Sequence, residues 1–180
     1  MKKIISILFS FLILFPVCLY SDPAKESLTT VKKMINFIRY KKNESAIKLI
    51  DIETFSKSLL QEEYETLSEE QKKKFQDTIQ NYIISKSFPL ALKYFQKIDL
   101  TYEKPILKGK EVEIPASLLY QGSEKVQFSW ILAEKNGTYL VKDFLTEKKL
   151  ASEVNRKQIL PIFKQKGFEE LIRQIEKASK

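Results

Sequence analysis

The sequence predicts an α+β domain, with helices at both ends and a curved antiparallel sheet of about four strands between them. Three observations carry this prediction. Apolar residues recur at helical spacing up to about residue 95, the period falls to two from about Ile98, and helical spacing returns near the end. At 180 residues and 43% hydrophobic, the chain can bury a substantial core and most simply forms one domain.

The first residues are not expected to belong to that domain. Lys2 and Lys3 precede an almost unbroken apolar run, Ile4 to Tyr20, and Ser21 follows it. This order is typical of a secretory signal peptide, which predicts a signal over residues 1–21 and a domain over residues 22–180. The run is only just short of the ~20 residues that a membrane span needs, so an uncleaved anchor is the alternative.

Cys18 allows a second alternative, lipidation, although Val17 is not the small residue that usually precedes a modified cysteine. Cleavage after Ser21 would leave a chain without cysteine, which excludes disulfides and thiolate chemistry. It would also lower the net charge from +8 to +6, because Lys2 and Lys3 are lost. The run Lys72 to Lys74 is interpreted as a solvated helix face, so no nucleic-acid partner is expected. We do expect a mild attraction of the basic chain to anionic lipid headgroups.

Histidine is absent from the whole chain. The absence excludes a Ser-His-Asp triad, a histidine-ligated zinc site and an imidazole base. Carboxylates, lysines or tyrosines could still act as acids or bases, so composition alone weakens an enzymatic reading without removing it. No metal or cofactor is expected.

The N-terminal helices are expected from local signals. Asp22 before Pro23 predicts an N-cap and a first helical residue. Ser68 and Gln71 have the spacing of a capping box, which opens a long helix, and Pro89 marks a kink or restart. The apolar positions that define the helical faces are Leu28, Val31, Ile35, Ile38, Phe55, Leu59, Leu60, Phe75, Ile79, Tyr82 and Ile83.

The sheet is expected from alternation. A first strand is predicted near Ile98 to Tyr102, and a second where Val112, Ile114, Ala116 and Leu118 alternate with polar residues. Asn136-Gly137 separates two further alternating runs and predicts a hairpin. Towards the end, Gly167 is expected to separate two helical segments, and Pro161 to kink the first of them.

The alternating runs carry one large aromatic face, formed by Phe128, Trp130, Leu132 and Phe144. Such a face can pack against helices in a filled core, or it can line a cavity. Residue types alone do not decide between these two.

The order of motifs then resembles a known family. The stretch "LLQEEYETLSEEQKKKF" is similar to the MlaC family, the periplasmic phospholipid-binding components of the Mla transport system, also called toluene-tolerance proteins. Gln61 stands where the family has glycine, and Tyr64 where it has tryptophan. The matching positions are Leu60, Tyr64, Leu67, Ser68, Gln71, Lys72 and Phe75.

Two further blocks follow in the same order. "GTYLVKDF" resembles the family's Trp-x-Val-x-Asp-Val strand, with Val141 and Asp143 matching. Arg156 and Gln158 match its Tyr-Arg-x-Gln-Phe, and "KGFEELIRQIEK" is similar to its last helix. Between the second and third blocks the family's Gly-x-Ser-Leu turn is missing, since this chain reads "LTEKKLASEV".

The resemblance implies an apolar cavity between sheet and helices that holds phospholipid acyl chains. It also implies a shuttle that carries lipid between the inner and outer membranes and helps to keep the outer membrane asymmetric. The implied partners are an inner-membrane ABC transporter complex with an MlaD-like ring and an outer-membrane MlaA-like lipoprotein complex. The expected lining residues are Val112, Ile114, Phe128, Trp130, Leu132 and Phe144 on the sheet, and Phe75, Tyr82, Phe88, Leu92, Phe95 and Phe163 on the helices.

Two alternatives stay open. One is an acid–base enzyme that uses Asp143, Tyr139 or a buried glutamate in a small pocket. The other is an envelope scaffold whose core is filled and binds no lipid. Arg156 is expected to pair with Asp143, or else to lie near a phosphate group.

Overall fold

The computed structural model describes residues 22–96, 98–120 and 122–180. The predicted signal peptide, the cleavage after Ser21 and the lipidation of Cys18 concern residues outside this part. Within the described ranges, no helix combines the length and the apolar character that a membrane crossing would need.

The helices before the sheet begin and end close to the predicted signals. They are α1 (Pro23–Arg39), α2 (Asn43–Ala46), η1 (Ile47–Leu49), α3 (Ile52–Leu60), η2 (Gln61–Thr66), α4 (Glu69–Tyr82), the π-helical turn η3 (Ile83–Ser87) and α5 (Phe88–Phe95). The carboxylate of Asp22 accepts a hydrogen bond from the Ala24 N–H at 3.0 Å, and Ser68 and Gln71 form the predicted capping box. The restart expected at Pro89 is the start of α5, where Pro89 occupies the first turn.

The sheet has six strands: β1 (Thr101–Tyr102), β2 (Ile106–Lys108), β3 (Glu111–Tyr120), β4 (Glu124–Lys135), β5 (Thr138–Thr146) and β6 (Lys149–Leu150). All pairs are antiparallel, in the order β1-β3-β4-β5-β6, and β2 pairs with β3 on the same edge as β1. The four predicted strands correspond to β1, β3, β4 and β5. The short strands β2 and β6 are additional, and they are only three and two residues long.

The β4–β5 hairpin turns at Asn136-Gly137, as predicted. Both residues have positive φ, 53° and 79°, which the twist of a two-residue hairpin turn requires. Further along, Ile131 pairs with Asp143 but Leu132 pairs with Val141, so Lys142 is the extra residue of a β-bulge. The bulge turns Asp143 to the face opposite Val141, although simple alternation would place both on one face.

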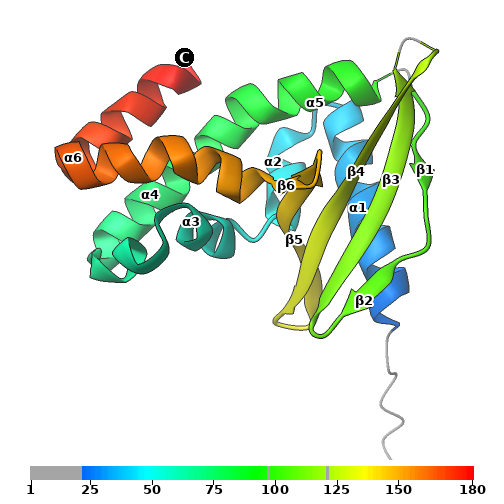
Figure 1. The fold of residues 1–180 in the computed structure, drawn as a ribbon, viewed down its shortest axis with the longest axis horizontal. Helices are drawn as coiled ribbons and strands as arrows, with labels where there is room; N and C mark the ends of the chain where they lie inside the picture. Colours follow the sequence, from blue (N-terminus) through cyan, green and yellow to red (C-terminus); the bar gives the residue numbers. More distant parts are fainter. Residues whose placement is uncertain (1–21, 97, 121) are drawn as a thin grey trace, which may run out of the picture.

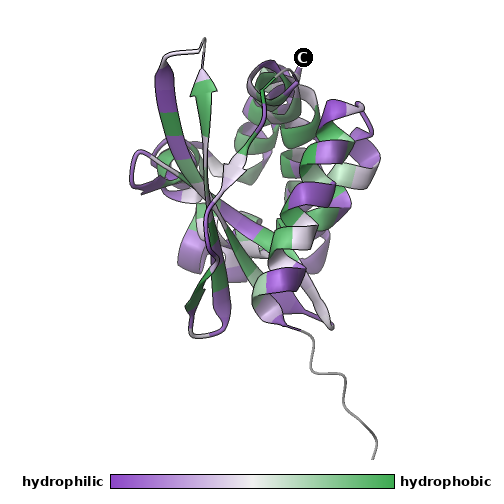
Figure 2. Ribbon diagram, turned by 90° about the vertical axis from the view of Figure 1, so that its right-hand side faces the viewer, coloured by the Kyte–Doolittle hydropathy of each residue, from purple (hydrophilic) through white to green (hydrophobic). Residues whose placement is uncertain are grey.

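Helices cover one face of the sheet. In Figure 1, α1 runs behind the strands and α5 lies at the upper end, while α3, α4 and α6 (Ala151–Ser179) extend to the side from the β5 edge. Figure 2 shows the sheet on one side and helices on the other, with hydrophobic segments between them. One hydrophobic cluster joins both regions, from Val31 and Ile35 of α1 to Leu171 of α6.

The last helix is divided at Gly167, as predicted. This residue has φ 80° and ψ 178°, and it is the residue within α6 with non-helical dihedral angles. The backbone therefore continues helically through Pro161, and the change of direction visible between the orange and red parts of α6 occurs at the glycine (Figure 1). Pro161 lies inside the helical part of α6, so the kink expected there stays a prediction, whereas the break predicted at Gly167 is confirmed.

Candidate functional site

An aromatic cluster occupies the centre of the helix-covered face of the sheet. Phe128 and Trp130 of β4 meet edge to face, with ring centroids 5.0 Å apart. Phe144 of β5 lies 5.5 Å from Phe128 and 5.9 Å from Trp130. Because Trp130 pairs with Phe144 in the ladder and Phe128 pairs with the small Ala116, the strand register itself brings these rings together.

Helix α5 closes this cluster from above. The ring of Phe95 lies 5.9 Å from Phe128 and 6.4 Å from Trp130. The end of α5 is held by Arg39 of α1, whose guanidinium donates to the carbonyl oxygens of Phe95 at 2.9 Å and Ile98 at 2.8 Å. The position of Phe95 over the sheet is therefore fixed by a charged group that satisfies the carbonyl of the last helical residue and one carbonyl in the segment that follows.

Tyr102 of β1 completes the cluster, with its ring 6.2 Å from Trp130. Burial raises the pKa of the Tyr102 phenol, although nearby Arg39 acts in the opposite direction. The ring thus lies in an environment that disfavours charge, as expected at the rim of an apolar core.

The structure brings the twelve predicted lining residues into one continuous core, but not all into one place. The six sheet residues share the helix-covered face, and Phe88, Leu92 and Phe95 of α5 lie on the same side of the core. Phe75 and Tyr82 belong to α4, which packs mainly on α3 and α6, and Phe163 belongs to α6. Eight of the twelve are buried, namely Phe75, Phe88, Phe95, Val112, Ile114, Phe128, Trp130 and Leu132.

The other four, Tyr82, Leu92, Phe144 and Phe163, are only partly buried. They have further half-buried apolar neighbours in the first half of α6, at Ile159, Leu160 and Ile162, where Val154 is 43% exposed. In the second half of α6, by contrast, Phe168, Leu171, Ile172 and Ile175 are buried. We call the half-buried set on α5, β5 and the first half of α6 the apolar seam.

Two open surface hollows are found elsewhere. One, of about 450 Å³, lies between η1, the start of α3, α4 and the β4–β5 turn, and Lys135 and Asp51 line it. The other, of about 830 Å³, lies beside Leu119 and Ile98 near the β3–β4 turn. None of the twelve predicted residues lines either hollow.

The first hollow is walled by an ion cluster. Lys135 donates to Asp51 and Glu53, each at 2.8 Å, and Thr54 donates to Asp51 through its N–H at 3.2 Å and its hydroxyl at 2.7 Å. Burial raises the pKa of Asp51, but the hydrogen bonds from Lys135 and Thr54 outweigh it, so the pKa lies below its usual value. Asp51 thus caps α3 and ties it to the hairpin.

Asp143, a candidate acid or base, has a structural role. Its carboxylate is buried and accepts hydrogen bonds from the Phe144 N–H at 2.8 Å, the Ser152 N–H at 3.1 Å and the Ser152 hydroxyl. It therefore caps the start of α6, where an anion is favoured. The expected pair with Arg156 is wrong: that guanidinium instead reaches the carbonyl oxygen of Ser58 at 3.5 Å.

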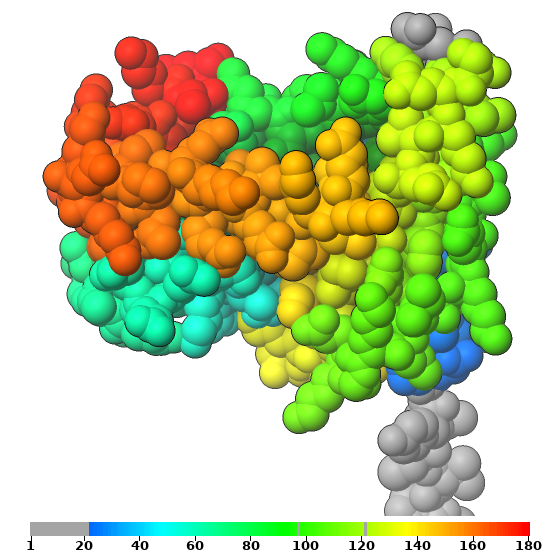
Figure 3. Space-filling model, viewed as in Figure 1, coloured from blue at the N-terminus to red at the C-terminus, as the bar shows by residue number. Residues whose placement is uncertain are grey.

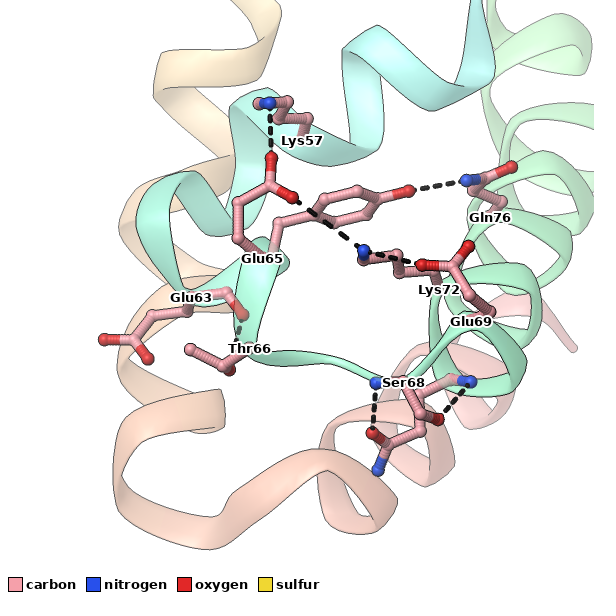
Figure 4. A network of polar contacts seen from close by, with 10 residues as sticks. Lys57, Glu63, Glu65, Thr66, Ser68, Glu69, Lys72 and Gln76 are labelled. Carbon is pink, nitrogen blue, oxygen red and sulfur yellow. Dashed lines mark hydrogen bonds and ion pairs between the residues drawn. The ribbon is translucent and has the colours of Figure 1, made fainter.

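The first family-like block forms a polar network at the foot of α4 (Figure 4). Gln76 donates to the hydroxyl of the buried Tyr64 at 2.5 Å, and the ammonium of Lys72 lies 5.8 Å from the Tyr64 ring. Lys72 also pairs with Glu69 at 2.9 Å and lies 3.8 Å from Glu65, which pairs with Lys57. The residues of this block therefore hold η2 against α4, and none of these polar contacts involves the aromatic cluster.

Sequence reasoning did not identify Arg39 or Ser152 as residues that position the site. Arg39 acts 56 residues away along the chain, and Ser152 lies in the segment where the family's turn is missing. The position of Ser152 just after the start of a helix is a local sign of capping. Its carboxylate partner, Asp143, can be identified only in the three-dimensional structure.

Comparisons with known proteins give one family and one similar fold. The family described as MlaC protein matches residues 24–177. The structure resembles that of the phospholipid-binding protein from Ralstonia solanacearum in complex with a phospholipid, with a TM-score of 0.74 and 14% sequence identity, over 88% of this chain and 97% of that chain. No curated protein matched the sequence.

Proposed function

This chain belongs to the MlaC family, and from that premise we propose that it binds a phospholipid in the periplasm and carries it between the inner and outer membranes. The match over residues 24–177 carries the proposal, since it includes nearly all of the described chain. The Ralstonia solanacearum protein supports it, because a protein of this fold is described there in complex with a phospholipid. Both point to binding rather than catalysis.

The apolar seam is the proposed entry for acyl chains. Leu92, Phe144 and Phe163 lie there with part of their apolar surface uncovered, and the ring of Phe144 lies beside the buried ring of Phe128. Acyl chains that separate α5 and the first half of α6 from the sheet would replace ring-to-ring contacts with ring-to-methylene contacts. In Figure 3 this half of α6, in orange, crosses the visible face of the molecule between the β4–β5 side and the second half of the helix.

The energetics require no chemistry. Burying a methylene gains roughly 0.8 kcal/mol over water, so two acyl chains gain on the order of 20 kcal/mol. A bilayer offers nearly the same gain, so a carrier needs only to match the membrane, and direction must come from partners. We propose as partners an inner-membrane Mla transporter complex with an MlaD-like ring and an outer-membrane MlaA-like lipoprotein complex, reached after export by the signal over residues 1–21.

One observation favours a second candidate, an envelope scaffold that carries no lipid. The rings of Phe95, Phe128, Trp130 and Phe144 touch one another, as they would in an ordinary filled core. The two candidates differ in whether these contacts open.

Native mass spectrometry separates them. The protein is purified from the periplasm without detergent, its mass is measured, and extracted lipid is identified. A stoichiometric phospholipid adduct supports the carrier, and a clean protein mass that is unchanged after incubation with vesicles supports the scaffold. For the location, Leu92→Asp in the seam should remove the adduct, whereas Leu107→Asp on the 60% exposed edge of β2 should retain it. An adduct of equal amount in both variants would refute the seam as the binding place.

A further inference from the structure

The first half of α6 has an inner side that is never fully covered. Within the described structure, no residue of this helix between Ser152 and Phe168 is buried. Four of its half-buried residues recur at i, i+3, i+4 and i+7 and so share one side of the helix; they are Arg156, Ile159, Leu160 and Phe163. A stripe of this kind ordinarily faces a packed core. Here it belongs to the apolar seam, and its first member carries a charge.

Among the described residues, most donors of the Arg156 guanidinium have no partner. The group makes one hydrogen bond there, to the carbonyl oxygen of Ser58 at 3.5 Å, and no ion pair. An arginine side chain has five N–H donors. The other two arginines of the chain make two shorter bonds each, Arg39 to backbone carbonyls at 2.9 and 2.8 Å and Arg173 to Glu170 at 2.8 and 2.7 Å.

The carboxylates closest to Arg156 in the sequence do not supply a partner. Asp143 is engaged by the N–H groups of Phe144 and Ser152 and by the Ser152 hydroxyl. Glu153, at i−3 on the helix, is exposed and forms no ion pair within the described chain. A charge that is partly removed from water is costly unless an opposite charge approaches it. Arg156 is therefore placed to take an anion as its partner.

A cap on α3 is the structural alternative for this side chain. Ser58 lies in the last turn of α3, beside the first half of α6 (Figure 1), and its carbonyl is at the end of a helix that a positive charge stabilises. A single bond of 3.5 Å is at the outer limit of hydrogen bonding. It leaves the other donors of the guanidinium available.

We propose, on the basis of the carrier function proposed above, that Arg156 binds the phosphate group of a phospholipid whose acyl chains lie along Ile159, Leu160 and Phe163. A guanidinium matches two phosphate oxygens with two parallel N–H bonds, which fixes the direction as well as the distance of the headgroup. Arg156 would thus be a positioning residue at the headgroup end of the seam.

The charges along α6 set the orientation of the lipid. Phe163 lies about 10 Å from Arg156 along the helix axis. Beside it, Lys164 pairs with Glu63 at 3.2 Å, so the cation at that end already has a carboxylate. The phosphate therefore belongs at the start of α6, and the acyl chains run toward Phe163. Since all phospholipids carry a phosphate, the site would select this class over neutral diacylglycerol rather than one headgroup over another.

The test is a competition between phosphatidylglycerol and diacylglycerol with identical acyl chains, offered to the exported protein in equal amounts in mixed micelles. Native mass spectrometry gives the ratio of the two adducts. We expect Arg156→Gln to lower the ratio of phosphatidylglycerol to diacylglycerol by about tenfold, because two charge-assisted hydrogen bonds are lost. Arg156→Lys keeps the charge but not the fork, and should lower the ratio by about threefold.

Arg173→Gln is the matched control. It removes the same charge from the same helix, but its side chain is 65% exposed, pairs with Glu170 and lies beyond Gly167. The ratio should stay as in the original chain. A role of Arg156 in capping α3 alone would lower both adducts together and leave their ratio unchanged, so the ratio separates the two roles.

NMR of the original chain gives the same answer if Arg156→Gln does not fold. The chain has three arginines, so their Nε signals can be assigned with one Arg→Lys variant each. The Arg156 signal should move on loading with phosphatidylglycerol and stay in place with diacylglycerol. Inorganic phosphate alone should leave it in place, and an equal shift with inorganic phosphate would assign the group to a soluble anion and overturn the headgroup role.

The headgroup contact and the carrier function fail in different ways. Adducts of both lipids with a ratio that the Arg156 variants do not change, or that Arg173→Gln changes equally, remove the contact and leave the carrier. Absence of both adducts from the original chain removes the carrier and the contact with it.

Discussion

Replacing Gln61 with glycine should stabilise the protein. Gln61 joins α3 to η2 with φ 54° and ψ −129°, a combination that is close to glycine-only, because a β-carbon clashes with the backbone there. The side chain is exposed, and within the described residues no hydrogen bond is recorded for it that glycine would lose. This is also the position at which the MlaC family resembled by this stretch carries glycine.

The magnitude follows from two opposing effects. Relief of a strained backbone is worth about 1–3 kcal/mol. Glycine also makes the unfolded chain more flexible, which costs about 0.5–1 kcal/mol. The net gain is therefore about 1 kcal/mol in the free energy of unfolding, or a rise of about 3 °C in Tm for a chain of this size.

Urea and thermal unfolding of Gln61→Gly, followed by Trp130 fluorescence, measure this gain in samples of equal lipid content. The matched control is Gln61→Ala, which keeps the β-carbon and should leave the unfolding free energy nearly unchanged. A glycine variant that is less stable than the original chain, or an alanine variant that gains as much, would show that the strain at this junction does not exist.

Substitutions in three further places test the cap of α3, the cap of α6 and the break in α6. Asp51→Ala should lower the unfolding free energy by about 2–3 kcal/mol in urea titrations, because it uncaps α3 and leaves Lys135 without one of its two carboxylate partners. Adding Lys135→Met to the Asp51→Ala chain should recover part of this loss. The pKa of Asp51 is lower in the folded protein than in the unfolded chain. The contribution of its ionised carboxylate to stability is therefore complete above about pH 4 and is lost as the pH falls through the folded-state pKa. Asp51→Asn should flatten the dependence of the unfolding free energy on pH in that window. Asp143→Ala should cost about 3 kcal/mol and Ser152→Ala about half of that by the same titration, and equal, negligible losses would contradict the cap of α6. Gly167→Ala should lower the unfolding free energy, and with it Tm, by about 1–2 kcal/mol. The loss would come from backbone strain alone, because no atom lies within 4 Å of the added β-carbon. An unchanged Tm would mean that the break can be rebuilt as helix.

The parts of the fold that could be predicted are those encoded by neighbours in the sequence. The cap at Asp22, the box at Ser68 and the turn at Asn136-Gly137 each depend on residues within four positions, so local pattern was sufficient. The helix-covered face of the sheet was also predictable, because alternation fixes it once the strands are known.

The parts that were missed depend on long-range pairing. The bulge at Lys142 depends on how β5 aligns with β4, and it moves Asp143 away from the face that alternation assigns to it. The partner of that carboxylate then becomes Ser152 rather than Arg156. Strands β2 and β6 contain too few residues for a period of two to be visible, and they exist because β3 and β5 offer edges for pairing.

The sequence does not distinguish a filled core from a lipid site, and the reason is physical. Residues such as Phe128 and Trp130 have the same pattern in both, since an apolar wall packs equally well on a ring or on a methylene chain. For the proposed carrier, the ring contacts then act as a cost on lipid entry. Each aromatic pair contributes about 0.5–1.5 kcal/mol beyond simple burial. Opening the five ring contacts among Phe95, Phe128, Trp130 and Phe144 would therefore offset several kcal/mol of the acyl-chain gain. A bilayer holds the same acyl chains without this cost. A core whose rings close again when lipid leaves would therefore release lipid to a membrane more readily than a rigid cavity. A variant in which Phe144 is replaced by a smaller apolar residue should bind lipid more tightly in the adduct measurement.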